Sequence, residues 1–175
     1  MTRSAKPCTR WPLHNRQVYA KIRRSDPLHH LIPPRAAPTF PGKGMTSVLL
    51  VDDESSMRSA LRKLFERAGL TVLEADSGRG ALEVIASNPD ISAVVSDFLM
   101  PEINGLDFYD ALVAQSPHLR GRVIFLTGAA RDPRVHQPLE QRGVPLISKL
   151  DDLEIVLDAV KLALLRRPLA GPTIL

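Results

Sequence analysis

The chain has little cysteine and no long apolar run. Cys8 is the single cysteine, which excludes an internal disulfide and fits a reducing compartment, so we expect a cytoplasmic protein. No stretch of about 18 apolar residues occurs, and no apolar signal segment follows the basic start, so no membrane span is expected. The pattern G-x-x-x-x-G-K-[ST] is also missing, so no P-loop nucleotide site is implied.

Positive charge is concentrated at the start of the chain. Residues 1–44 hold nine Lys/Arg against the single acid Asp26, a net +8, whereas residues 45–175 hold 14 Lys/Arg against 18 acids, a net −4. The segment 1–44 also holds seven of the 15 prolines and no sustained apolar period. Such a segment cannot bury enough surface to offset its chain entropy, so we expect a disordered extension that is dispensable for folding.

Two interpretations of this extension stay open. It is a basic arm for nucleic acid or another anionic surface, or it is not translated and the protein starts at Met45. We favour the second, because Met45 lies two residues before the first expected strand of the folded part.

Residues 45–167 are expected to form one α/β domain, followed by a short tail of residues 168–175. Short apolar runs alternate with amphipathic stretches, a pattern typical of parallel strands joined by helices. The expected strands are Ser47–Val51, Thr71–Ala75, Ala93–Ser96, Val123–Leu126 and Pro145–Ser148. The expected helices are Ser56–Ala68, a helix capped by Ser77 that ends before Asn88, Gly105–Gln115, a helix within Asp132–Arg142, and Leu153–Leu165 capped by Asp151 or Asp152.

Polar side chains follow four of these strands at the point where each strand ends. They are Asp52, Asp53, Asp97, Thr127 and Lys149. The carboxyl ends of parallel strands meet at one crevice, where ligands bind. Converging acids, a hydroxyl and an ammonium suit a cation and a phosphoryl group rather than an apolar substrate.

Charge repulsion points to a divalent cation at this crevice. Two carboxylates about 4 Å apart repel by roughly 4 kcal/mol at an effective dielectric constant near 20. Three carboxylates therefore need a cation or a protonated member. Mg²⁺ takes hard oxygen ligands and keeps waters that a substrate phosphate can replace. A carboxylate held beside it can attack phosphorus and become an aspartyl phosphate.

Four motifs occur together in a fixed register. They are Val51-Asp52-Asp53-Glu54, Asp97-Phe98-Leu99-Met100-Pro101 with Gly105 after it, Leu126-Thr127-Gly128, and Ser148-Lys149. In this register the chain resembles the receiver domain of bacterial response regulators, from about Thr46 to Leu165. The resemblance implies a flavodoxin-like doubly wound fold with sheet order 2-1-3-4-5.

The resemblance also implies roles for the metal ligands. Asp53 is expected to bind Mg²⁺ directly, Asp52 directly or through water, and Asp97 as the third acid. The main-chain carbonyl of Leu99 is expected to be a further ligand. A simpler alternative is that Asp52 and Asp53 only cap the following helix.

The phosphoryl group has its own expected partners. By resemblance, Asp97 is the phosphoacceptor and Thr127 is the hydroxyl that follows the phosphoryl group. Lys149 is expected to pair with Asp97 or its phosphate.

Three positions depart from the family pattern. Leu150 stands where a proline usually follows the lysine, so the Lys149–Leu150 bond is expected to be trans. Leu146 stands where an aromatic side chain commonly swings as a readout, so the usual coupling to Thr127 is in question. Pro138 is expected to break a helix that begins at Pro133, which would alter the partner surface.

These features predict a stand-alone receiver rather than an enzyme with its own substrate. It would accept a phosphoryl group from a sensor histidine kinase or a histidine phosphotransfer protein. It would then signal by a conformational change to a downstream protein, because nothing after Leu165 could form an effector domain. No contact of the domain with membrane or nucleic acid is expected.

Two alternatives remain at this stage. One is a pseudo-receiver that keeps the fold as an interaction module without switching. The other is an aspartate-based phosphatase, which needs a second acid two residues after its nucleophile, where this chain has Leu99.

Overall fold

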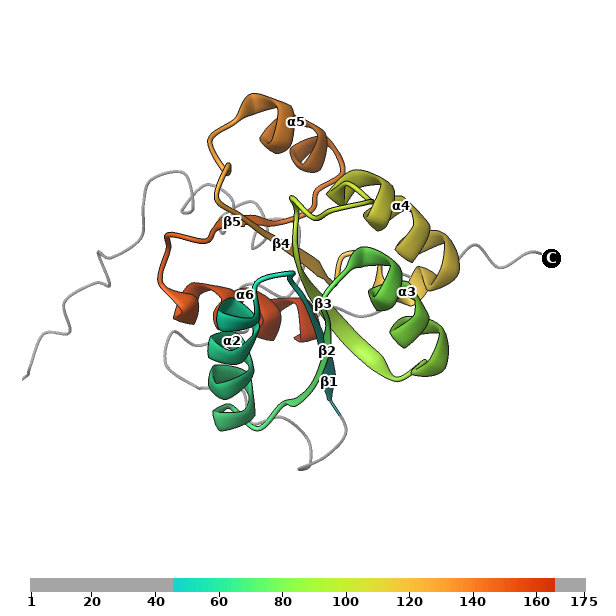
Figure 1. Ribbon diagram of the computed structural model, residues 1–175. Helices are drawn as coiled ribbons and strands as arrows, with labels where there is room; N and C mark the ends of the chain where they lie inside the picture. The colour runs from blue at the N-terminus through green and yellow to red at the C-terminus, as the bar shows by residue number, and fades with distance from the viewer. Residues whose placement is uncertain (1–45, 166–175) are drawn as a thin grey trace, which may run out of the picture. The chain divides into compact units, whose positions relative to one another are not determined.

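The computed structural model describes residues 46–165. The predicted N-terminal extension, Met45 and the short tail lie outside the described residues. Strands and helices alternate along the described chain (Figure 1). In order they are β1 Ser47–Val51, α2 Ser55–Arg67, β2 Thr71–Ala75, α3 Gly78–Ser87, β3 Ile91–Asp97, α4 Gly105–Gln115, the short 3-10 helix η1 Pro117–Leu119, β4 Val123–Thr127, α5 Pro133–Gln141, β5 Leu146–Ser148 and α6 Leu153–Leu165.

The strands form one parallel sheet in the order β2-β1-β3-β4-β5. This confirms the expected flavodoxin-like order. None of the helices within residues 46–165 has the length and apolar character needed to cross a bilayer.

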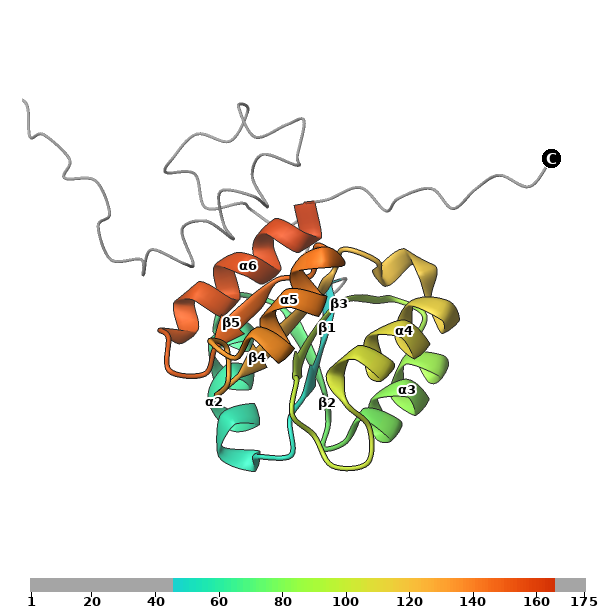
Figure 2. The same ribbon diagram turned by 90° about the horizontal axis from the view of Figure 1, so that it is seen from above.

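Both faces of the sheet are covered by helices, as Figures 1 and 2 show. Successive strand residues point to opposite faces. In β1, Leu49 and Val51 pack in one cluster with residues of α3, α4 and α5, whereas Val48 and Leu50 pack in a second cluster with residues of α2 and α6. Burial on both faces explains why β1 and β4 read as continuous apolar runs.

Side-chain caps begin four of the helices. Each cap accepts a hydrogen bond from a main-chain N–H of the first turn, which would otherwise lack a partner. The capping residues are Ser77 for α3, Asn104 for α4, Asp132 for α5 and Asp152 for α6. Of the two candidates for α6, the cap is therefore Asp152, while Asp151 accepts from the N–H of Ser148 at 3.3 Å.

Pro138 does not break α5, and this expectation from the sequence was wrong. The helix runs unbroken from Pro133 to Gln141 with Pro138 inside it. The proline removes one donor to the carbonyl four residues earlier, on exposed Arg134, where water can replace the lost bond. The buried side chains of Val135 and Leu139 hold the helix against the sheet on both sides of the proline.

Gly105 allows close packing between the start of α4 and the end of β3. A Cβ atom at this position would lie 2.4 Å from Cδ2 of Phe98. The Phe98 ring cannot easily move, because it is buried and packs edge-to-face on Phe125 with a centroid distance of 5.5 Å. The glycine that ends the Asp-x-x-Met-Pro-x-x-x-Gly pattern is therefore required by packing.

We expect Gly105→Ala to lower the free energy of unfolding by about 1–3 kcal/mol, the usual cost of overpacking. The measurement is urea denaturation. Gly128→Ala is the matched control, because a Cβ there would meet nothing within 4 Å. Equal stability of the two variants would contradict the packing argument.

Candidate functional site

The register of the sheet brings the polar residues from separate strands to one level. Asp97 pairs with Leu126 and Thr127 pairs with Ser148, so the strands end side by side. Asp97 and Thr127 are themselves the last residues of β3 and β4, one residue further than the predicted strand ends. The Lys149 N–H donates to the Thr127 carbonyl at 3.0 Å, which extends the pairing of β4 and β5 into the site.

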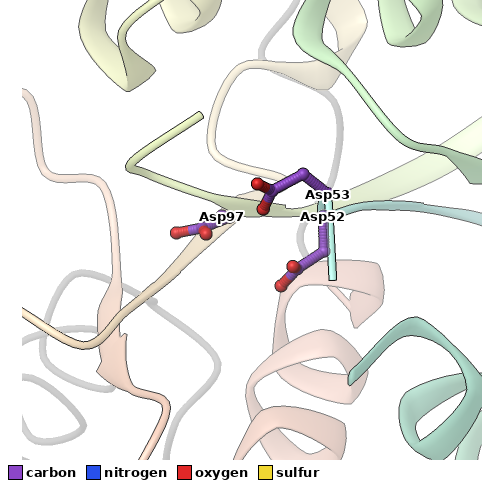
Figure 3. Close-up of side chains that lie close together, drawn as sticks. All are labelled: Asp52, Asp53 and Asp97. Atoms are coloured by element: carbon purple, nitrogen blue, oxygen red, sulfur yellow. The ribbon is translucent and has the colours of Figure 1, made fainter. Parts of the chain in front are cut away.

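Three carboxylates gather at this edge, as Figure 3 shows. One oxygen from each of Asp52, Asp53 and Asp97 lies within 4.8 Å of the other two. Asp52 and Asp97 are 2% and 5% exposed, whereas Asp53 is exposed. The site therefore combines two buried acids with one that faces solvent.

Lys149 supplies the counter-charge for the buried pair. Its Nζ lies 2.8 Å from Oδ2 of Asp52 and 2.7 Å from Oδ2 of Asp97. Burial raises the pKa of Asp52, although the ammonium and the N–H of Glu54 oppose this effect. Burial also disfavours the charged lysine, but its hydrogen bonds to the two carboxylates outweigh burial and raise the pKa of Lys149.

Main-chain amides hold the reactive side chains in place. Oδ1 of Asp97 accepts from the Leu99 N–H at 3.0 Å, and Oδ1 of Asp52 accepts from the Glu54 N–H at 2.9 Å. Oγ1 of Thr127 accepts from the Ala129 N–H at 3.1 Å. This bond uses the Thr127 oxygen as an acceptor, so the hydroxyl can still donate a hydrogen bond, and the residue is fully buried.

The residue that caps the N-terminus of α2 is not one of the three acids of the site. Glu54 is the N-cap residue of α2, and its side chain makes no capping bond. Asp52 accepts from the Glu54 N–H, which lies before the helix, while its other oxygen faces Lys149. This argues against helix capping as the whole role of Asp52.

Arg58 is a site neighbour that the sequence reasoning missed. Its guanidinium donates to the main-chain carbonyl of Asp52, and its Nε lies 3.8 Å from Oε1 of Glu74 on β2. An arginine one turn into the helix after an acidic pair is the available sequence signal. That signal is weak, because the contact with Glu74 depends on where β2 lies.

The structure shows the peptide geometry and the burial of the positions that depart from the family pattern. No peptide bond among the described residues is cis, so the Lys149–Leu150 bond is trans as expected. Leu150 and Leu99, which stand beside the site in sequence, are 89% and 56% exposed. Leu146 is buried in the cluster that includes Val135 and Leu139 of α5.

The donor set has the chemistry of a magnesium site. Carboxylate oxygens are the hard ligands that Mg²⁺ prefers, and a site with one exposed acid leaves room for bound water. Three carboxylates against one ammonium also leave a negative charge for a cation to balance. The residues present therefore fit the ion.

Comparison with known proteins agrees with this geometry. The family model described as "Response regulator receiver domain" matches residues 48–161. The chain belongs to the response regulator receiver domain family. Receiver domains typically bind Mg²⁺ through an acidic cluster, and they interact with histidine kinases or phosphotransfer proteins and with downstream effectors.

Two curated relatives of this chain are proteins that extend well beyond the matched region. The rice "Two-component response regulator ORR7" (Oryza sativa subsp. japonica) is 31% identical over 102 residues, covering 58% of this chain and 49% of that protein. The "C4-dicarboxylate transport transcriptional regulatory protein DctD" of Pseudomonas aeruginosa is 33% identical over 128 residues, covering 73% of this chain and 27% of that protein. The chain thus spans half or less of these two relatives.

Solved structures of isolated receivers match over nearly their full length. A receiver domain protein from Clostridium thermocellum has a TM-score of 0.61 at 26% identity, covering 68% of this chain and 94% of that one. The receiver domain of the hybrid histidine kinase CckA has a TM-score of 0.56 at 28% identity, covering 67% and 98%.

We expect Lys149→Met to lower the free energy of unfolding by about 3 kcal/mol near neutral pH, because it leaves two buried carboxylates without their partner. The measurement is urea denaturation without divalent cations. Lys161→Met is the control, since within residues 46–165 Lys161 forms a surface pair with Asp158 at 3.5 Å. The loss should shrink in an Asp97→Asn background, and equal losses in both backgrounds would contradict the pairing.

The contacts of Lys149 with Asp52 and Asp97 also make stability depend on pH in the alkaline range. Because the folded state raises the pKa of Lys149, its stabilisation is complete below the ordinary pKa of lysine. That stabilisation is lost as the pH rises through the raised pKa. The Lys149→Met protein should therefore lose less stability in alkali than the wild type.

Proposed function

We propose that this receiver accepts a phosphoryl group on Asp97 in a Mg²⁺-dependent reaction. The donor would be a phosphohistidine on a sensor histidine kinase or a histidine phosphotransfer protein. One observation carries the proposal: the Asp97 carboxylate is held between the Leu99 N–H and the Lys149 ammonium, beside two further acids. The phosphorylated domain would signal by a conformational change to a partner protein.

The transfer is a balanced substitution at phosphorus. An oxygen of Asp97 forms the new P–O bond while the P–N bond to the donor imidazole breaks. The electron pair of that bond returns to the imidazole nitrogen, which then takes up a proton. The products are an acyl phosphate on Asp97 and a free histidine, which leaves with the donor protein.

The remaining site residues have supporting roles in this proposal. Asp52, Asp53, Asp97 and the Leu99 carbonyl would hold Mg²⁺, which neutralises charge on the phosphoryl oxygens when it is bound. Lys149 would stay beside Asp97 and pair with a phosphoryl oxygen. Thr127 would donate a hydrogen bond from its hydroxyl to another phosphoryl oxygen.

We expect Asp97→Asn to abolish labelling by radiolabelled acetyl phosphate in the presence of Mg²⁺, because the amide is not a nucleophile. Chelation of Mg²⁺ should abolish labelling of the wild type as well. Asp90→Asn is the matched control, since Asp90 is exposed and precedes β3 at the opposite end of the strand. A wild-type chain that takes no label would contradict the proposal and favour the pseudo-receiver.

The lifetime of the phosphorylated state gives a second test. By family resemblance, the side chains two residues after Asp97 and two after Thr127 orient or block the attacking water. Here these residues are Leu99 and Ala129, whose side chains cannot hydrogen-bond to water. Their main-chain amides bond to the Asp97 carboxylate and the Thr127 hydroxyl, so both residues are tied directly to the site.

We therefore expect slow self-dephosphorylation, measured as loss of label after the donor is removed. The double substitution Leu99→Asn and Ala129→Glu should hasten it, and a barrier lowered by about 1.4 kcal/mol would make it tenfold faster. Equal decay of the native and double-variant phosphates would show that these positions do not set the rate.

A further inference from the structure

We infer that Arg58 is a positioning residue for Asp53, the exposed acid of the site, and so for Mg²⁺ binding. The inference rests on the proposed Mg²⁺ site and names a residue that shapes it without binding the ion. Arg58 is the fourth residue of α2, and its side chain is 19% exposed. It reaches back from the helix to the turn between β1 and α2.

The contact that matters is made to the main chain. The Arg58 guanidinium donates to the Asp52 carbonyl oxygen. That oxygen lies in the same rigid peptide plane as the nitrogen and Cα of Asp53, because the peptide bond is planar. Holding the carbonyl therefore restricts where the nitrogen and Cα of Asp53 lie, and the Asp53 side chain starts from that Cα.

Other hydrogen bonds of Asp52 already hold the rest of the turn between β1 and α2. The Asp52 N–H donates to the Ala75 carbonyl at 3.2 Å, and the Asp52 carboxylate accepts from the Glu54 N–H at 2.9 Å. Figure 3 shows Asp52 and Asp53 leaving the same strand end on different courses. Buried Asp52 is also held by Lys149, whereas exposed Asp53 depends on the course of its main chain.

The Arg58 guanidinium is also held by an acidic residue of β2. Its Nε lies 3.8 Å from Oε1 of Glu74, and the other oxygen of Glu74 lies 3.0 Å from Nη1 of Arg62. Glu74 belongs to β2, so the edge of the sheet supports the metal-binding turn through Arg58. Arg62 lies on the same helix and shares this carboxylate, and its guanidinium pairs with Glu74 and Glu66.

The test compares Arg58→Met with Arg62→Met in the full chain. Mg²⁺ affinity is measured by titration calorimetry, and thermal melting in chelator monitors folding. Residues that orient metal ligands typically cost tenfold or more in affinity when lost, so we expect Arg58→Met to weaken Mg²⁺ binding by roughly tenfold. Arg62→Met should bind as the wild type does.

The sign of the change separates positioning from simple electrostatics. Removing a positive charge near a cation site would by itself tighten Mg²⁺ binding. Weaker binding in Arg58→Met therefore supports positioning, and Arg58→Lys, which keeps one donor, should recover part of the loss. Unchanged or tighter binding in Arg58→Met, or an equal loss in Arg62→Met, would overturn the inference.

Two further results keep the test decisive. If Arg58→Met does not fold, Glu74→Gln replaces it, because this change keeps Arg58 but removes its carboxylate partner. Glu74→Gln should weaken Mg²⁺ binding by a smaller factor, and wild-type affinity would overturn the inference. A wild-type chain that binds no Mg²⁺ would instead overturn the proposed function.

Discussion

The ammonium of Lys149 is the counter-charge on which the strand-end site depends. Asp52 and Asp97 are nearly buried, and two unit charges about 4 Å apart repel by roughly 4 kcal/mol at an effective dielectric constant near 20. A single Nζ within 2.8 Å of one carboxylate and 2.7 Å of the other replaces this repulsion by attraction. In the sheet order, β3 and β4 lie between β1 and β5, so the Lys149 side chain ties distant strand ends together.

The frame around this ion pair is built from main-chain contacts. Amides of Leu99 and Glu54 hold the two carboxylates, and the Arg58 guanidinium holds the Asp52 carbonyl. Further back, Gly105 lets α4 begin against Phe98, the residue that follows β3. Each contact limits the motion of a short loop and so holds the acids in place.

The route from the site toward α5 depends on packing in this chain. Thr127 ends β4 and pairs with Ser148 of β5, and Leu146 of the same strand packs in the cluster that includes Val135 and Leu139. A leucine side chain has no ring and no hydrogen-bonding group. The contact that Leu146 makes with this cluster is therefore apolar packing.

The sequence by itself determined the positions of the strands and helices to within a few residues, and it placed Asp52, Asp53, Asp97 and Lys149 at strand ends. These features depend on local patterns. The strand order was implied by the family resemblance, and the sheet confirms it. Only the tertiary structure decided that Asp53 is exposed while Asp52 is buried, and that Arg58 bridges the turn after β1 to Glu74. It also decided that α5 continues through Pro138, because buried Val135 and Leu139 hold the helix on the sheet. These features arise from contacts between residues far apart in the chain, where packing outweighs local preference.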